Sequence, residues 1–156
     1  MSGETEAVVF AIDGALFALP VTRVREILDR RPAFRVPSAP DWLVGLIDLR
    51  GQSVAVIDLR AFATATHTEA GDGARILIVE TGEHGPCLGL LVDQVVDVAC
   101  HANADRQDVP AIVPQRGPWR LSGVLRRGEA FVGLLDMEAI AALADDARYA
   151  CEAVAA

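Results

Sequence analysis

Two stretches of this 156-residue chain decide its fold: residues 42–58 read WLVGLIDLRGQSVAVID, and residues 119–136 read WRLSGVLRRGEAFVGLLD. Each stretch holds an apolar run, an Arg-Gly pair and a second apolar run that ends in Asp. Glycine adopts the positive φ that a tight hairpin turn requires, so each stretch predicts two strands joined by a turn. The two stretches look like two copies of one unit.

The copies extend beyond these stretches. Equivalent positions at an offset of 78 carry the same residue, with a one-residue slip near the Arg-Gly turn: Gly45 and Gly123, Asp58 and Asp136. Upstream, apolar residues recur at an offset of 71: Val21, Val24 and Ile27 correspond to Val92, Val95 and Val98. A unit of roughly 75 residues with several short strands has the size of a small barrel, and closure into a barrel hides strand edges. We therefore expect two packed barrels.

Short apolar runs bounded by turn residues recur along the chain and predict an all-β fold. The runs are Val8–Ile12, Leu16–Leu19, Gly45–Leu49, Ser53–Ile57, Arg75–Val79, Cys87–Val92, Val95–Val98, Leu121–Leu125 and Ala130–Leu135. Asp13-Gly14, like the two Arg-Gly pairs, predicts a hairpin. The run Arg75–Val79 is apolar on both faces, so one face can fill a barrel while the other meets the second barrel.

Helical patterns are few. Four apolar residues have one-face spacing and predict a short early helix: Val21, Val24, Ile27 and Leu28. Asp136 is placed to cap a longer helix at Met137–Leu143. The stretches Thr64–Gly73 and Ala102–Pro118 lack periodicity and predict loops. We expect a tail at residues 1–7, a single domain at residues 8–144 made of two interleaved barrels at about 8–74 and 75–144, and an Ala-rich tail at residues 145–156 that is either helical or frayed.

Composition excludes several functional classes. The chain has no lysine, and 14 Arg against 22 Asp and Glu give a net charge of -8, which argues against nucleic-acid binding and against lysine-dependent chemistry. The acidic N-terminus does not resemble a signal peptide, and no apolar run approaches the roughly 18 residues of a membrane span. The three cysteines suit a reducing compartment. We expect a cytoplasmic protein.

The sequence predicts neither a metal nor a catalytic site. The residues that deserve a metal check are His84, Cys87, Cys100 and His101, but adjacent residues of a strand point to opposite faces, so the last two rarely share one ion. We interpret Cys87 as a small buried apolar residue, with a thiol-dependent enzyme as the alternative. Five aspartates sit mostly at strand ends, where Asp opens turns or caps helices: Asp48, Asp58, Asp93, Asp97 and Asp136. We expect no enzyme and no cofactor.

Four segments in order resemble the CheW-like coupling proteins of bacterial chemotaxis: Val21–Leu28, Val44–Gly51, Val54–Arg60 and Leu88–Val95. The resemblance runs from about Val8 to Leu143. It implies two SH3-like barrels packed side by side, without enzymatic activity. It also implies an adaptor of two-component signal transduction that links the cytoplasmic tips of methyl-accepting chemoreceptors to the regulatory domain of a CheA-type histidine kinase. Such a protein associates with the membrane only through receptor arrays.

The resemblance also implies where partners bind. The family's receptor-contacting motifs fall on Val24, Glu26, Ile27, Leu49, Arg50 and Gly51. The Arg50 guanidinium offers five donors to a partner helix, and Val24 and Ile27 suit the floor of an apolar groove. The alternative interpretation makes these two residues ordinary core and Arg50 a solvated turn residue.

Two departures from the family pattern are Asp48, where Asn is usual, and Ala55, where Pro is frequent. We expect the Asp48 charge to hold the Arg50 guanidinium back from a partner.

A basic stretch suits an acidic partner face or is simply solvated: Arg23, Arg25, Arg30, Arg31 and Arg35. A scaffold of a kinase pathway outside chemotaxis, such as motility or biofilm formation, remains the alternative function.

Overall fold

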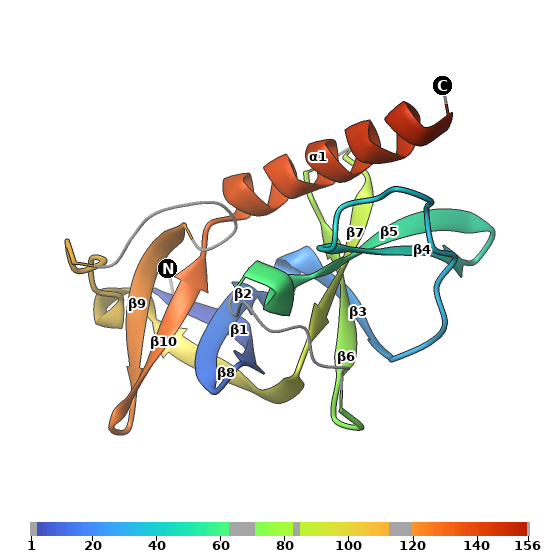
Figure 1. Cartoon of the computed structure of the whole chain (residues 1–156). Coiled ribbons are helices and arrows are strands. Elements are labelled where there is room, and N and C mark those ends of the chain that lie inside the picture. Colours follow the sequence, from blue (N-terminus) through green and yellow to red (C-terminus); the bar gives the residue numbers. More distant parts are fainter. Residues whose placement is uncertain (1–2, 63–70, 83–84, 113–119, 156) are drawn as a thin grey trace.

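The computed structural model of the chain describes residues 3–62, 71–82, 85–112 and 120–155. Within these ranges the strands form two five-stranded sheets (Figure 1). The first sheet runs in the order β8 (Gln94–Ala102), β1 (Glu4–Ile12), β2 (Ala15–Pro20), β10 (Ala130–Leu135) and β9 (Leu121–Arg127). The second runs in the order β3 (Val24–Asp29), β6 (Arg75–Glu80), β7 (Cys87–Val92), β5 (Gln52–Asp58) and β4 (Leu43–Leu49). Each of the predicted apolar runs is a strand.

The two sheets have the same topology. Replacing every strand by the one five places away in the chain turns the order β8-β1-β2-β10-β9 into β3-β6-β7-β5-β4. The same replacement turns the parallel pair of the first sheet, β2 with β10, into the parallel pair of the second sheet, β7 with β5. The predicted internal repeat is thus a structural one. Each sheet takes strands from both halves of the sequence, so the boundary near residue 74 divides the two copies along the chain but not the two sheets.

Each sheet closes on itself through one bridge. Phe34, which follows β3, exchanges two 2.8 Å hydrogen bonds with Leu46 of β4, and Gln107, which follows β8, exchanges two of 2.9 Å with Val124 of β9. Leu46 and Val124 directly follow the repeated glycines Gly45 and Gly123, so they are equivalent positions of the two copies. We call the closed first sheet barrel 1 and the closed second sheet barrel 2. The fold is the predicted pair of SH3-like barrels.

The repeated glycine beside each bridge has a steric cause. Gly45 has a φ of 148°, and a Cβ there would collide with the backbone of Phe34. A Cβ at Gly123 would lie 2.6 Å from Nε of Arg106. The backbone of the closing segment therefore passes directly over the glycine in barrel 2, and a side chain of the closing segment does so in barrel 1.

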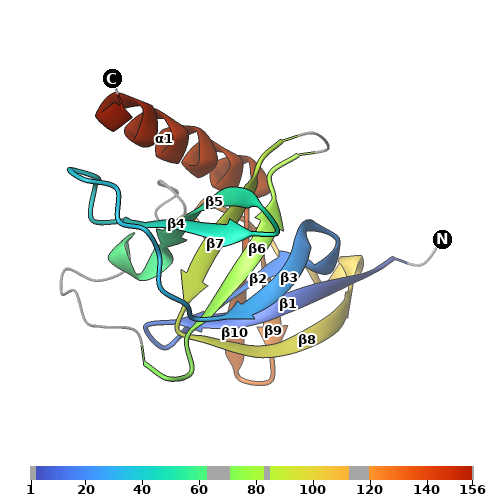
Figure 2. The ribbon, with the colours of Figure 1, turned by 90° about the vertical axis from the view of Figure 1, so that its right-hand side faces the viewer.

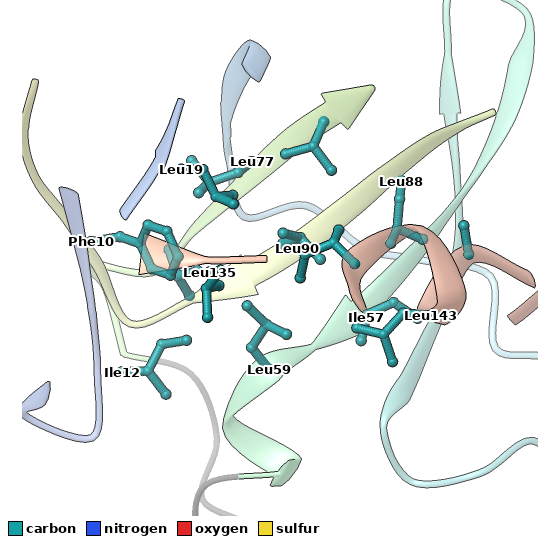
Figure 3. Packing of buried hydrophobic residues seen from close by; sticks show 14 of the residues in the cluster. Phe10, Ile12, Leu19, Ile57, Leu59, Leu77, Leu88, Leu90, Leu135 and Leu143 are labelled. Carbon is teal, nitrogen blue, oxygen red and sulfur yellow. The ribbon is translucent and has the colours of Figure 1, made fainter. Parts of the chain in front are cut away.

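In the part of the chain that the structure describes, the apolar residues form three cores. Ala7 and Val9 of β1 point into barrel 1, whereas Val8, Phe10 and Ile12 point into a large cluster between the barrels. The strand β6 confirms the predicted two-faced pattern, with Ile76 and Ile78 inside barrel 2 and Leu77 and Val79 in the cluster between the barrels. Figure 3 shows this central cluster, where side chains from both sheets point toward one another.

The helix α1 (Met137–Ala155) covers part of the central cluster. The predicted cap is confirmed, because Oδ1 of Asp136 accepts a 2.9 Å hydrogen bond from the backbone N–H of Glu138. The helix extends well past Leu143, so the Ala-rich stretch from residue 145 to residue 155 is helical. Its buried face packs near β5, on the outside of barrel 2 (Figure 2). No helix in the described ranges is both long and apolar enough to cross a membrane.

Other predictions need correction. Of the predicted early helix only a 3-10 turn, η1 (Val21–Arg23), forms, and Val24, Ile27 and Leu28 belong to β3. Pairing with β6 outweighs the weak helical spacing of this β-branched stretch.

Strand β1 begins at Glu4, inside the predicted tail at residues 1–7. The predicted loop from Ala102 begins with the turn η3 (Asn103–Asp105), residues 113–119 lie outside the described residues, and so do residues 64–70 of the other loop.

Candidate protein-interaction surface

The six predicted contact residues lie on β3 and on the β4–β5 hairpin. Closure of barrel 2 brings these distant parts of the sheet together at one seam, because β3 and β4 are its two edges. At this seam Nη1 of Arg50 lies 2.8 Å from Oε2 of Glu26. The side chain of Arg50 is 72% exposed and that of Glu26 is 23% exposed. The pair therefore fastens the seam and remains accessible from solvent.

The turn that carries Arg50 has the backbone that the sequence predicts. Arg50 and Gly51 have φ angles of 52° and 83°, and both residues are exposed. Two successive positive φ angles give a hairpin turn whose twist matches that of the strands. Leu49 points the other way and packs, partly buried, against the interior of barrel 2.

The residues of β3 do not share one face. Glu26 pairs with Ile78, whose side chain is inside barrel 2, whereas Ile27 pairs with Leu77 of the central cluster. Residues paired across a sheet share a face, so the ion pair and Ile27 lie on opposite sides of β3. Ile27 is 42% exposed, and Val24 is partly buried against the central cluster. The strand thus presents an apolar side and a charged side.

The expectation that Asp48 holds Arg50 back is wrong. Within the described part of the chain the carboxylate that Arg50 contacts belongs to Glu26. Asp48 is exposed and faces Ser53 across the hairpin. Ala55 is partly buried and lies opposite Leu88 of β7.

The basic stretch is divided by the fold. Arg25 donates from Nη1 to Sγ of Cys87 at 3.3 Å and lies 4.0 Å from Glu80. The hydrogen bond from Arg25 to Cys87, together with the nearby carboxylates of Glu80 and Glu26, raises the pKa of Arg25. Three other arginines line a cavity of about 740 Å³ at the mouth of barrel 2: Arg30, Arg31 and Arg35.

The candidate catalytic and metal residues are dispersed. Sγ of Cys87 accepts its hydrogen bond from an arginine, which cannot act as a general base because it stays protonated. Among the described residues no group of three or more His, Cys, Asp or Glu side chains is arranged to hold a metal ion. His84 lies outside the described residues.

Sequence reasoning missed a second seam pair. Nη2 of Arg127 lies 3.0 Å from Oδ2 of Asp97 and fastens β9 to β8 in barrel 1. The repeat contained the signal, because Asp97 follows Val95 as Glu26 follows Val24, and Arg127 precedes its turn glycine as Arg50 does. The missed residues therefore stand at the positions of the repeat that are equivalent to the predicted ones.

Comparisons with known proteins agree with this architecture. The model of the CheW-like domain family matches residues 6–145. A probable chemotaxis protein CheW from Rhizobium etli is 30% identical over 138 residues, which cover 88% of each chain. The chemotaxis protein CheW of Bacillus subtilis is 26% identical over 133 residues, or 85% of this chain and 84% of that protein. The crystal structure of the scaffolding protein TtCheW from Thermoanaerobacter tengcongensis superimposes with a TM-score of 0.75 at 25% identity, covering 87% and 85% of the two chains.

Proposed function

The chain belongs to the CheW-like domain family, and from this premise we propose that it is a non-catalytic adaptor that couples chemoreceptors to a CheA-type histidine kinase. The partners would be the cytoplasmic tip of a methyl-accepting chemoreceptor and the regulatory domain of the kinase. Relatives named as chemotaxis proteins and a solved relative described as a scaffolding protein support an adaptor role. The proposal places the protein in the cytoplasm, held near the membrane by receptor arrays, with no cofactor or metal.

The observation that carries the proposal is the seam of barrel 2. There an exposed guanidinium and an exposed isoleucine lie on two sides of the same edge strand, β3. Arginine is enriched among the residues that dominate binding energy, and burying an exposed apolar side chain against a partner is favourable. An amphipathic helix could place its apolar residues against Val24 and Ile27 while its polar groups accept hydrogen bonds from Arg50. The site residues Val24, Glu26, Ile27, Leu49, Arg50 and Gly51 remain part of this proposal.

The proposed mechanism is tethering. A rigid double barrel that holds a receptor on one surface and a kinase on another raises the concentration of the kinase near the receptor. This effect needs only simultaneous binding on two separate surfaces. It needs no covalent step by Cys87 or by any other residue.

Co-sedimentation with membranes that contain a chemoreceptor, with and without the kinase, tests the proposal. We expect the parent protein to sediment with the membranes and to increase the amount of sedimented kinase. Ile27→Asp or Arg50→Ala should weaken receptor binding at least about tenfold, because Arg50→Ala removes a residue type enriched at hot spots and Ile27→Asp places a charge in an apolar contact. Arg148→Ala is the matched control, since Arg148 is a 70% exposed arginine on α1.

The alternatives give different results. Failure of the parent to bind any chemoreceptor fragment, together with binding to a kinase of another pathway, would favour a scaffold for motility or biofilm formation. Unchanged receptor binding by both Ile27→Asp and Arg50→Ala would contradict the proposed surface. Cys87→Ala should bind as the parent does, and a loss of function in this variant with normal partner binding would favour the thiol-dependent enzyme.

A further inference from the structure

The interiors of the two barrels differ most at one place. Residues at equivalent strand positions of the two copies are called twins here. Ala7 and Ala99 face each other across β1 and β8 inside barrel 1, and their twins across β6 and β3 inside barrel 2 are Ile76 and Leu28. Ile and Leu each carry three more side-chain carbons than Ala. Barrel 1 is therefore much less filled at this place than barrel 2.

The other twins that are both fully buried nearly balance, whereas the partly buried Leu16 of barrel 1 is larger than its twin Cys87 of barrel 2. The fully buried twins differ by at most one side-chain carbon: Val9 and Ile78, Leu125 and Ile47, Val132 and Val54, Leu134 and Val56, Ala18 and Gly89. The same topology thus closes with the large pair in barrel 2 and with the small pair in barrel 1. Two alanines at this place are not a requirement of the fold, which makes the difference informative.

The missing volume opens to the surface. A cavity of about 880 Å³ lies between β8 and β9 and reaches the interior of barrel 1. Its apolar floor is formed by Ala7, Val9, Ala99, Leu125 and Val132. The Asp97–Arg127 ion pair lines the cavity toward the β9–β10 turn, and Gln107 lines it on the side of the bridge that closes the barrel. The opening is therefore a short slot in the barrel wall.

The walls of the slot are strand edges. Within the described residues β8 pairs along its length with β1 alone, and β9 with β10 and, at Val124, with Gln107. The backbone N–H and C=O of Val124 point to Gln107, with which they form hydrogen bonds. Because these groups alternate sides along a strand, the N–H and C=O of Arg126, two residues further on, point to the same side, into the slot. On the opposite wall, the N–H of Val98 already donates a 2.7 Å hydrogen bond to Oδ1 of Asp97, which a docked backbone would replace. Such edges bind an extended backbone.

We propose that this slot is a docking site for an extended segment of a partner protein that inserts one Leu- or Ile-sized side chain over Ala7 and Ala99. The size of the anchor follows from barrel 2, where Ile76 and Leu28 fill the equivalent space. The extended conformation follows from the two strand edges that form the walls. The inference does not depend on the proposed receptor surface, which lies on barrel 2.

The test uses the full chain and two capped heptapeptides, Ser-Thr-Val-Leu-Val-Thr-Ser and the same peptide with Ala in place of Leu. Backbone amide shifts in NMR spectra report binding. The Leu peptide should cause saturable shifts at Ala99, Leu125 and Arg126, and the Ala peptide should bind at least about tenfold more weakly because it lacks the buried carbons. Shifts from neither peptide, or equal binding of both, would overturn the proposal.

Filling the slot gives the decisive comparison. Ala99→Leu introduces the residue that barrel 2 carries at the twin position. We expect this variant to unfold at a higher urea concentration and to bind the Leu peptide at least about tenfold more weakly than the parent does. Val98→Leu is the matched control, because Val98 is 51% exposed and points away from the barrel interior, as does its partner Val8. It should bind the peptide as the parent does. Undiminished peptide binding by a folded Ala99→Leu protein would show that the space is only a packing difference.

Discussion

At the scale of single residues, Asp58 and Arg60 form the most buried ion pair in the described part of the chain. Asp58 is 4% exposed, and its carboxylate accepts hydrogen bonds of 2.9 Å from the backbone N–H, Nε and Nη2 of Arg60. Nη1 of Arg60 also lies 3.7 Å from Asp93, which in turn accepts a 2.7 Å hydrogen bond from the N–H of Asp13. The pair therefore links barrel 2 to the β1–β2 turn of barrel 1.

The repeat supplies a matched comparison for this pair. Asp136, the twin of Asp58, accepts a 2.7 Å hydrogen bond from Nε of Arg120, whose side chain is 44% exposed. Removing Arg60 leaves a buried carboxylate without its partner, which costs about 3–5 kcal/mol, whereas an exposed pair contributes about 1 kcal/mol or less. We expect Arg60→Ala to lower the free energy of unfolding in urea far more than Arg120→Ala does. Equal losses would show that Asp58 does not depend on Arg60.

The twin glycines permit a similar prediction. At Gly45 a Cβ would meet the backbone of Phe34, which cannot turn away, and the φ of 148° is strained for other residues. At Gly123 a Cβ would meet the flexible side chain of Arg106. We expect Gly45→Ala to cost about 3 kcal/mol of unfolding free energy and Gly123→Ala about 1 kcal/mol. A cost for Gly45→Ala no larger than that for Gly123→Ala, in urea titrations, would contradict this account of the closing bridge.

At the scale of elements, Asp58 is the last residue of β5 and Asp136 directly follows β10, and different structures begin after these two equivalent residues. The N–H of Asp58 donates to the carbonyl of Trp42 at 2.8 Å, and the N–H of Asp136 donates to that of Arg120 at 2.9 Å. After Asp58 the chain makes one 3-10 turn, η2 (Leu59–Phe62), whereas after Asp136 it forms the 19 residues of α1. Within the described residues, the second copy alone therefore contributes a long helix to the central cluster.

This helix should be required for stability. Leu143 of α1 is 5% exposed and belongs to the cluster between the barrels, while Tyr149 of the same helix is 76% exposed. Truncating a buried leucine removes apolar contacts and leaves a cavity, so Leu143→Ala should cost about 2–5 kcal/mol. Tyr149→Ala should change the unfolding free energy by less than about 0.5 kcal/mol. Thermal unfolding of the two variants measures the difference, and similar melting temperatures would mean that α1 adds little to the core.

At the scale of the whole molecule, neither half of the chain contains a complete barrel. Barrel 1 combines β1 and β2 with β8, β9 and β10, and barrel 2 combines β3, β4 and β5 with β6 and β7. The central cluster adds residues from both sheets and from α1. Folding of either barrel therefore requires contacts between the two copies.

We accordingly expect the fragments 1–74 and 75–156 to be unfolded when each is alone, because each would expose unpaired strand edges and half of every core. The full chain should unfold in a single transition that is the same by circular dichroism and by tryptophan fluorescence. Circular dichroism and proton NMR of the isolated fragments provide the measurement. A cooperative unfolding transition in either fragment would contradict the interleaved organisation.

The sequence alone determined the parts of this structure that depend on local patterns. Apolar runs predicted the strands apart from β3, and the Arg-Gly and Asp-Gly pairs predicted three of the hairpins, because strand faces and tight turns are specified by neighbouring residues. The similar residues in the two halves predicted the twin barrels. At β3 the local signal misled, since pairing with β6 decides the conformation of Val24–Asp29. Only the tertiary structure decided which strands the copies exchange, that Glu26 rather than Asp48 receives Arg50, and that a slot opens over Ala7 and Ala99. Each of these features depends on barrel closure, which brings together edges far apart in the chain, and no local pattern specifies which distant side chains then meet.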